Sequence, residues 1–241
     1  MLAGVGTTWY TWLEQGRDVR PSNEVLRAIA EALRFDPTEC RHLFELHDRP
    51  APAVPVSGRE DIDEPLRRML DSLTGQPAFV LGRRWDILAW NRAAVAVFGD
   101  YERLEGDERN SLHMLFANAR HRRLLLDWEA VARASLAMFR ADSARHAGDP
   151  AFTRLVASLT RLSPEFAAWW PQREVAQPLT GQKRIKHPRV GSMRFEYSSF
   201  GVGESTGIKL IVFTPVSEHG TADKLARLLD LGNRPVSKGP C

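Results

Sequence analysis

The residues of this chain whose types could support catalysis are scattered. Its seven histidines fall at positions 42, 47, 113, 121, 146, 187 and 219. His113 and His121 are eight residues apart, but no Asp, Glu or Cys completes a convincing metal-binding set around them. A lone Cys40 is weak evidence for a nucleophile, and there is no Gly-x-Ser-x-Gly sequence or phosphate-binding Gly-rich loop. The sequence therefore predicts a protein that is not an enzyme and uses no metal and no cofactor.

A second group of chemically informative residues lies near the N-terminus. A helix that reads the major groove of DNA needs short polar residues in its first turn and apolar residues on its opposite face. Gly6-Thr7-Thr8 supplies the turn and the polar tip, while Tyr10 and Leu13 would face inward and Gly16 would end the helix. Three residues follow where phosphates would pass: Arg17, Arg20 and Ser22. The pattern predicts a DNA-contacting helix.

The charge of this segment counts against strong DNA binding. Residues 1–50 contain six Lys and Arg and eight Asp and Glu, a net charge of −2, although the whole chain carries +3. A basic footprint, the usual sign of a nucleic-acid-binding protein, is therefore absent where it would be expected. The alternative interpretation is that residues 1–48 are a small helical appendage that packs on another surface.

Composition divides the chain into three segments. Residues 1–48 show helical periodicity, with Ser22 as a candidate N-cap for a helix whose apolar stripe runs from Val25 to Leu33. Residues 49–60 are rich in Pro and small residues and predict a semi-extended linker. Residues 61–236 form the larger unit. No apolar run approaches the roughly 20 residues that a membrane-spanning helix needs, so no membrane partner is predicted.

The larger unit is predicted to have strands at both ends of a helical insert. We expect strands at 79–83, 86–91, 175–185, 192–198 and 208–214. We expect helices at 92–98, 110–126, 128–145, 150–162, 164–170 and 221–231. One antiparallel sheet covered on one face by helices fits this order. The predicted fold class is α+β, with an all-α N-terminal part that is a partial helix-turn-helix.

The N-terminal segment resembles the XRE or phage-repressor helix-turn-helix family over residues 5–17, 20–22 and 26–33. The resemblance implies that Thr7, Thr8 and Trp12 face bases and that Arg17, Arg20 and Ser22 face phosphates. It also implies a core made of Tyr10, Leu13, Ile29 and Leu33. Members of that family have on the order of 20–25 further residues before the position of Leu2, which brace the recognition helix. We therefore expect a helix-turn-helix that is N-terminally truncated.

The larger unit resembles the MmyB-like ligand-binding domain that actinobacterial regulators fuse to such a helix-turn-helix. The resemblance rests on the order and spacing of many short matches, among them residues 85–91, 109–110, 127–129, 163–166 and 187–191. It implies a PAS-like fold in which an antiparallel sheet and helices enclose an apolar cavity, and a fatty-acyl chain as the ligand type.

An acyl-binding pocket needs apolar walls and one or two polar groups that fix the head of the ligand. The residues that we expect to form the sheet floor are Met193, Phe195, Tyr197 and Phe213. Those expected in the walls are Trp90, Phe116, Trp128, Met138, Phe166 and Trp169. The candidates for holding a carboxylate are Asn91, Asn110, Arg140 and His187.

Each of these residues also has a structural interpretation. Any single aromatic residue is more often ordinary core than ligand contact. Asn91 follows a strand and could cap the next helix. Arg140 could pair with Glu129 or Asp142, and His187-Pro188 could form a turn.

These observations predict a cytoplasmic, homodimeric transcriptional regulator that binds double-stranded DNA and a small apolar ligand. Its predicted domains are a partial helix-turn-helix at 1–48, a linker with a short helix at 49–76 and a ligand-binding domain at 77–233. The alternative is a DNA-incompetent ligand-binding or protein-interaction module derived from such a regulator.

Overall fold

The computed structural model describes residues 6–17, 19–47, 60–146, 148–172, 181–203 and 207–233. The chain divides into two compact units, residues 1–58 and 59–241. Apart from Glu60, the predicted linker at 49–60 lies outside the described residues. The two units are described separately below.

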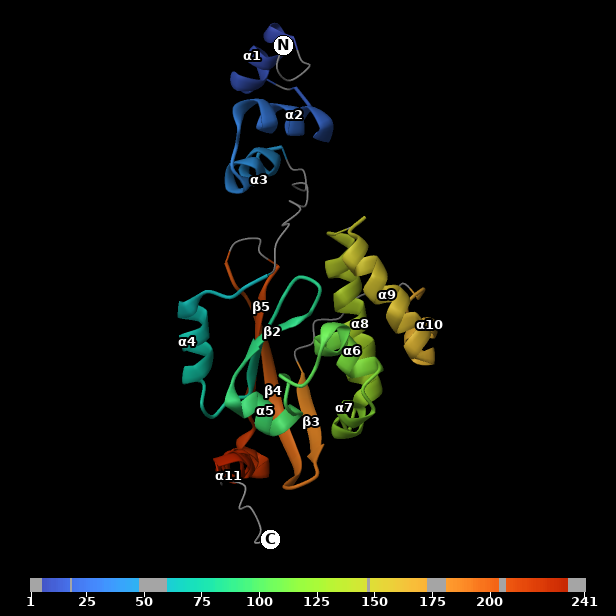
Figure 1. Cartoon of the computed structure of the whole chain (residues 1–241). Coiled ribbons are helices and arrows are strands. Elements are labelled where there is room, and N and C mark those ends of the chain that lie inside the picture. The colour runs from blue at the N-terminus through green and yellow to red at the C-terminus, as the bar shows by residue number, and fades with distance from the viewer. Residues whose placement is uncertain are drawn as a thin grey trace. The chain divides into compact units, whose positions relative to one another are not determined.

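The smaller unit consists of α1 (Thr7–Glu14), α2 (Asn23–Leu33) and α3 (Pro37–Glu45) (Figure 1). α1 ends before Gly16, whose φ of +65° favours glycine because it has no Cβ. The predicted N-cap is confirmed, since Ser22 Oγ accepts a hydrogen bond from the Val25 backbone N–H at 3.3 Å. Leu26, Ile29 and Ala30 of α2 are buried, as is Phe44 of α3.

The core expected for this unit is only partly present. Ile29 is buried, but Tyr10 and Leu13 are half-buried and Leu33 is 48% exposed. The expectation that Leu33 belongs to the core is therefore wrong. Leu33 is the last residue of α2, next to the left-handed Arg34 at which the helix ends.

The larger unit is built on a five-stranded antiparallel sheet in the order β2-β1-β5-β4-β3. The strands are β1 (Ala78–Leu81), β2 (Ile87–Trp90), β3 (Gln182–His187), β4 (Gly191–Gly201) and β5 (Lys209–Pro215). β4 is longer at both ends than the strand predicted at 192–198. β3 extends two residues beyond the predicted end at 185, and positions 175–180 of that prediction lie outside the described residues.

The helices α5 (Arg92–Phe98), α6 (Ser111–Phe116), α7 (Ala119–Leu124), α8 (Trp128–Ala144), α9 (Pro150–Leu162) and α10 (Pro164–Trp169) separate β2 from β3. A short 3-10 helix, η1 (Gly106–Arg109), precedes α6. The single helix predicted at 110–126 is wrong, because the chain breaks between α6 and α7. Asn118 causes this break, since its Oδ1 accepts from the His121 backbone N–H and starts a new helix.

Alternation along the strands divides the core into two parts. Phe79 and Leu81 of β1 face the main core, to which α5 to α10 and the C-terminal α11 (Thr221–Asn233) contribute. Ala78 and Val80 face a smaller core completed by α4 (Glu64–Ser72). Figure 1 shows α4 on one side of the sheet and α6 to α10 on the other. The α+β prediction is confirmed, but the sheet is not covered on one face alone.

Two single bridges join loops to the outer strands of the sheet. Asp86, just before β2, pairs with Asn110, and Ile185 of β3 pairs with Leu125. The Leu126 backbone N–H also donates to the carbonyl of Arg184 at 3.0 Å. After β5, η2 (Ser217–His219) leads into α11.

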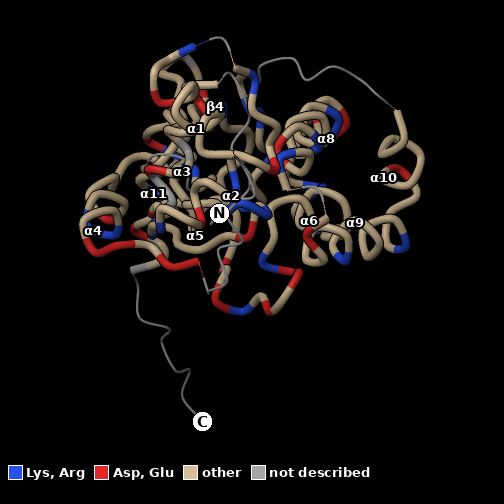
Figure 2. The backbone as a smooth tube through the Cα atoms, turned by 90° about the horizontal axis from the view of Figure 1, so that it is seen from above, with Lys and Arg blue, Asp and Glu red and all other residues tan. Residues whose placement is uncertain are grey.

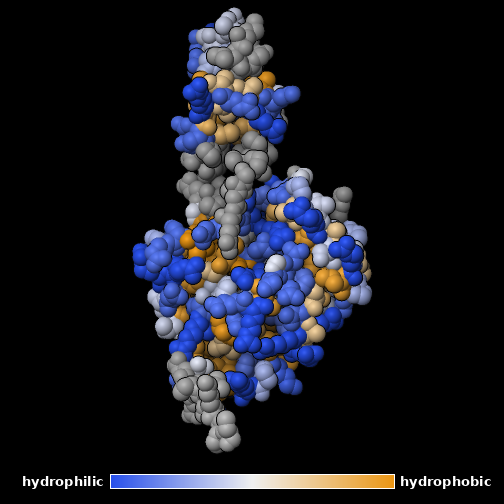
Figure 3. All heavy atoms as spheres, in the orientation of Figure 1, coloured by the Kyte–Doolittle hydropathy of each residue, from blue (hydrophilic) through white to orange (hydrophobic). Residues whose placement is uncertain are grey.

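Charged residues of both signs are interspersed along α4 and α8 (Figure 2). Hydrophilic residues cover most of the visible face of the larger unit, with small apolar patches between them (Figure 3). This distribution is the ordinary one for a surface in water.

Candidate ligand pockets and DNA-contacting surface

A small pocket of about 50 Å³ lies between the sheet and α8. Strands β1, β3, β4 and β5 supply one wall, α8 supplies the other, and Trp85 and Ser111 close one end. The lining residues are Phe79, Leu81, Trp85, Ser111, Val131, Ser135, Met138, Lys183, Tyr197, Ser199, Lys209 and Ile211. Most of this lining is apolar, which makes its two lysines the most informative residues of the site.

Lys183 of β3 places its ammonium group in this pocket without a carboxylate partner among the described residues. Its Nζ lies 5.0 Å from the ring centre of Phe213 and 5.6 Å from that of Tyr197. Burial lowers the pKa of Lys183 from 10.5 to about 8, because the charged form loses its hydration. At neutral pH the pocket therefore holds a largely protonated and uncompensated cation.

Tyr197 of β4 adds a second unpaired polar group to the same pocket. Its hydroxyl oxygen is buried and has no hydrogen-bond partner within the described part of the chain. Burial raises the pKa of Tyr197 to about 12, so the hydroxyl keeps its proton and is able to donate. Buried polar groups without partners are uncommon in folded proteins, and such groups often indicate a missing ligand or water.

The second lysine of the pocket is compensated. Lys209 Nζ donates to the carboxylate of Asp142, which also accepts from Trp85 Nε1 at 2.9 Å and from Arg145. Burial raises the pKa of Asp142, but the hydrogen bonds from Lys209 and Trp85 outweigh this effect, so the net pKa is lowered. Asp142 thus ties α8 to β5 and to the turn that carries Trp85.

Trp85 adopts an unusual backbone conformation in this turn. Its φ is +67°, in the left-handed region that a bulky side chain rarely occupies. The conformation directs a buried indole to Asp142 and lets the Trp85 carbonyl accept from Ser111 N–H at 2.9 Å. The surrounding contacts therefore hold the turn in a sterically unfavourable state.

Four of the predicted wall residues do contact one another. Phe116 lies 5.1 Å from Phe166, 6.0 Å from Trp169 and 6.1 Å from Trp128, measured between ring centres. Arg140, predicted to bind a carboxylate or to pair with an acid, donates to the carbonyls of Trp169 and Trp170 at 3.1 Å each. These residues fill the space between α6, α8 and α10, outside the lining of the small pocket.

The predicted asparagines are occupied by the fold. Asn91 Oδ1 accepts from Ala78 and Ala94 N–H groups at 3.0 and 2.9 Å, and its Nδ2 donates to the carbonyls of Leu73 and Gln76. Its capping interpretation is thus the one that the geometry supports. The second asparagine, Asn110, caps α6 by the same kind of hydrogen bond.

The remaining predicted residues fall in three places. Phe195 and Phe213 are fully buried in the sheet floor, with ring centres 6.4 Å apart. Trp90 packs against Tyr101 at 5.3 Å and lies 5.6 Å below the guanidinium of Arg109. Of the predicted contacts, Tyr197 from the sheet floor and Met138 from the helical wall line the small pocket.

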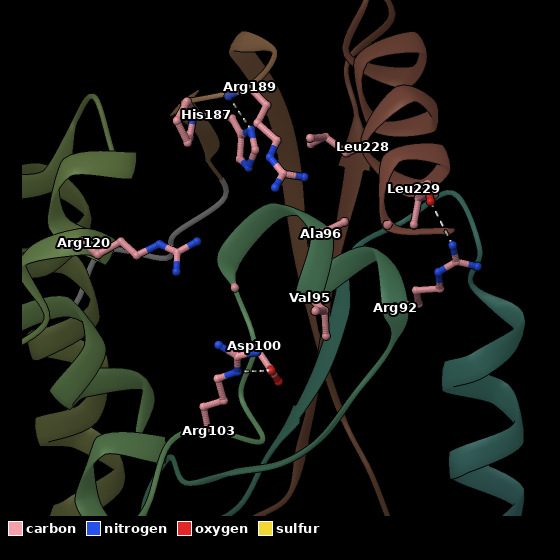
Figure 4. A pocket seen from close by; sticks show the side chains of 13 residues that line it. Arg92, Val95, Ala96, Asp100, Arg103, Arg120, His187, Arg189, Leu228 and Leu229 are labelled. Carbon is pink, nitrogen blue, oxygen red and sulfur yellow. Dashed lines mark hydrogen bonds and ion pairs between the residues drawn. The ribbon is translucent and has the colours of Figure 1, made fainter. Parts of the chain in front are cut away.

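His187 lies in a different and larger pocket of about 410 Å³ (Figure 4). It is 7% exposed, and its Nδ1 accepts from the Arg189 backbone N–H at 3.2 Å. The turn predicted at His187-Pro188 is present, since it joins β3 to β4. This pocket is formed by α5, α7, α11 and that turn, away from α8.

The predicted DNA-contacting residues are all exposed on the smaller unit. Thr7 and Thr8 lie in the first turn of α1, and Trp12 is 40% exposed one turn further on. The guanidinium of Arg17 lies 5.8 Å from the Trp12 ring centre. The other two members of the set are Arg20 and Ser22. None of these side chains is needed for the core of the unit, so each is available for contact.

Sequence reasoning missed Lys183, Lys209 and Trp85. A usable signal existed for Lys183, because Ile185 and His187 have the same parity in β3 and both face inward. No comparable signal marked Trp85. Among the described residues there is no cluster of His, Cys, Asp or Glu able to hold a metal ion. In that same part of the chain, no helix has the length and apolar character needed to cross a membrane.

Comparison with known families agrees with this architecture. Residues 62–229 match the MmyB-like transcription regulator ligand-binding domain, and residues 1–43 match a helix-turn-helix domain. No curated protein matches the chain.

The chain therefore belongs to the MmyB-like transcription regulator family, since the matched domain spans more than half of its length. It combines a DNA-binding helix-turn-helix with a ligand-binding domain, which is the arrangement of a DNA-binding transcription regulator. The resemblance noted from the sequence is confirmed.

Proposed function

We propose that the ligand of this regulator is an amphipathic acid, such as a fatty-acyl carboxylate, whose anionic head occupies the pocket between the sheet and α8. The observation that carries the proposal is the Lys183 ammonium, buried without a carboxylate partner among the described residues, beside the unpaired hydroxyl of Tyr197. An uncompensated buried cation is costly, and a carboxylate would both neutralise it and accept a hydrogen bond from the Tyr197 hydroxyl.

The size of the pocket indicates how the apolar tail would enter. Ligand pockets commonly have volumes of about 300–1,000 Å³, whereas this one has about 50 Å³. The head group fits with little change, but a tail requires Val131 and Met138 of α8 to move away from the strands. Such a ligand binds the opened arrangement better than the closed one and shifts the population toward it.

This opening is the proposed regulatory signal. A ligand can change the conformation only by its difference in affinity for the two states. The Asp142 contacts to Lys209 and Trp85 hold α8 against β5 and therefore favour the closed arrangement. The antiparallel sheet with its helical insert between β2 and β3 supports the PAS-like description of the domain.

On the DNA side, we propose an XRE-type contact in which Thr7, Thr8 and Trp12 face bases. Three residues, Arg17, Arg20 and Ser22, face phosphates. Their exposure supports these roles. A homodimer would present two such surfaces to a two-fold operator in the cytoplasm.

Two experiments test the proposed function. Mass spectrometry of molecules extracted from the purified chain should detect a monoanionic amphiphile, and recovery of neutral ligands alone would contradict the acid proposal. Gel-shift titration against the promoter next to the gene should give a specific complex at moderate salt. If no specific complex forms, the chain is the DNA-incompetent module that its acidic N-terminal segment also permits.

A further inference from the structure

The larger pocket, about 410 Å³ in volume, has a composition unlike that of the pocket beside α8. One side is apolar and consists of Val95 and Ala96 of α5 with Leu228 and Leu229 of α11. The lining also contains five Arg and Asp residues, which are Arg92, Asp100, Arg103, Arg120 and Arg189. Four guanidinium groups and one carboxylate therefore line a space of small-molecule size.

Two of the four arginines already have partners. Arg92 donates to the carbonyl of Leu229 at 2.8 Å, and Arg103 forms an ion pair with Asp100 at 2.9 Å. Arg120 of α7 and Arg189 of the β3–β4 turn have no carboxylate partner among the described residues. Figure 4 shows the guanidinium groups of both pointing into the pocket from different elements. The positive charge of the pocket is thus concentrated on these two side chains.

Both unpaired arginines are positioned by the fold. The Cζ of Arg120 lies 3.7 Å from where a Cβ on Gly99 would be, so its guanidinium sits against the end of α5. Gly99 has a φ of +114°, which only glycine adopts readily. His187 accepts from the Arg189 backbone N–H and also has a hydrogen bond with the Ala96 backbone. His187 is therefore a positioning residue that holds the Arg189 turn against α5.

The state of His187 supports this role. Burial lowers its pKa, and the charges of Arg189 and Arg120 lower it further, so the ring is neutral at pH 7. A neutral ring can accept at Nδ1 and donate at Nε2, as the two hydrogen bonds require. The pocket thus keeps the two arginines as its uncompensated charges.

We propose that this pocket binds a small phosphate-bearing molecule, with its phosphate between Arg120 and Arg189 and its organic part on Val95, Ala96 and Leu228. Planar guanidinium groups bind phosphate oxygens in pairs, and two of them match the charge of a phosphate monoester. The site shares no lining residue with the pocket beside α8. It would therefore serve as a second effector site on the ligand-binding domain, whatever the first ligand is.

The test uses the full chain and phenyl phosphate as the probe, with phenol as the neutral comparison. Calorimetry at about 0.1 M salt should show saturable binding of phenyl phosphate, and the His187 ring signals in NMR should shift during the titration. Binding of phenol with equal affinity would overturn the proposal. Failure of phenyl phosphate to bind at millimolar concentration would overturn it as well.

Variants distinguish specific binding at this pocket from non-specific attraction of the phosphate to a basic surface. Arg120→Gln and Arg189→Gln should each weaken phenyl phosphate binding by at least tenfold, and the double variant should abolish it. The matched control is Arg154→Gln with Arg161→Gln on α9, which removes the same charge from exposed positions that have no carboxylate partner among the described residues. Equal weakening by the control pair would show that no specific phosphate site exists. Because all four side chains are exposed, unchanged melting temperatures should confirm that each variant folds.

Discussion

Replacing Lys183 with methionine should stabilise the protein and at the same time remove its affinity for an acidic ligand. Methionine keeps the apolar stem but removes the buried charge. The difference between a lysine pKa of 10.5 and the pKa of about 8 for Lys183 corresponds to about 3 kcal/mol of folding free energy at neutral pH. Although the ammonium group is buried, the residue as a whole is only half-buried, so we expect a smaller gain of about 2 kcal/mol in the free energy of unfolding.

The sign of the pH dependence follows from the direction of the pKa change. The folded state binds the Lys183 proton less tightly than the unfolded state, so the cost of burial is fully present below pH 8. It declines as the pH rises from about 8 and vanishes above 10.5. Urea unfolding at about pH 7, 8, 9 and 10 spans this window. Over this range the free energy of unfolding of the unmodified chain should rise relative to that of Lys183→Met.

Ligand binding supplies the second measurement. Decanoate should bind the unmodified chain at pH 7, and its affinity should fall by about tenfold for each pH unit above 8, because the bound carboxylate needs the protonated ammonium. 1-Decanol has the same tail without the charge, so its affinity should not follow this profile. Lys183→Met should lose decanoate binding selectively and keep 1-decanol binding.

The control is Lys186→Met, an exposed lysine on the opposite face of the same strand. It removes the same charge without entering the pocket and should change neither stability nor decanoate binding appreciably. The reasoning is refuted if Lys183→Met destabilises the protein, or if decanoate binding survives the substitution. If Lys183→Met and Lys186→Met have the same stability and the same decanoate affinity, burial of the Lys183 charge determines neither property.

Three further predictions concern other parts of the chain. Asn91→Ala should cost about 3 kcal/mol or more in urea unfolding, because two buried and two partly buried backbone groups lose their partner. A loss below about 1 kcal/mol would show that water replaces the amide. Asp142→Asn leaves Lys209 without its charge partner and should lower stability by about 2–3 kcal/mol in the same assay at pH 7, an expectation that fails if the variant unfolds like the parent. Trp12→Ala should weaken operator binding by more than about tenfold in gel shifts while leaving the melting temperature unchanged, since the side chain is 40% exposed; unchanged affinity would remove Trp12 from the DNA contact.

Much of the fold could be predicted from local patterns. The alternation of Met193, Phe195 and Tyr197 in β4 is the direct signature of a half-buried strand, and the apolar run 208–214 predicts another strand, which is β5. Asp149 with Pro150 marks the start of α9 because both residues favour the first turn of a helix. The break at Asn118 was missed because the residues on either side of it have good helical patterns.

The candidate site was harder to predict, and the reason is physical. Phe116 and Trp169 were both expected in the wall of a pocket, but a sequence does not show whether neighbouring rings enclose a space or fill it. Here they pack directly against each other at 6.0 Å. Lys183 was missed because a lysine on an edge strand is normally expected to point into solvent. Only the arrangement of β3, β4 and β5 brings its ammonium group over two aromatic rings.

The two bridges at the margins of the sheet bear on how copies of this chain can associate. The unpaired backbone groups of an outer strand are a template on which a second molecule can add a strand, and this is a common route to aggregation. Next to β2 that position is taken by Asn110, and along β3 it is taken by Leu125 and Leu126. Growth of the sheet from molecule to molecule would have to displace these segments first. The two segments therefore protect the margins of the sheet against the addition of strands at these positions.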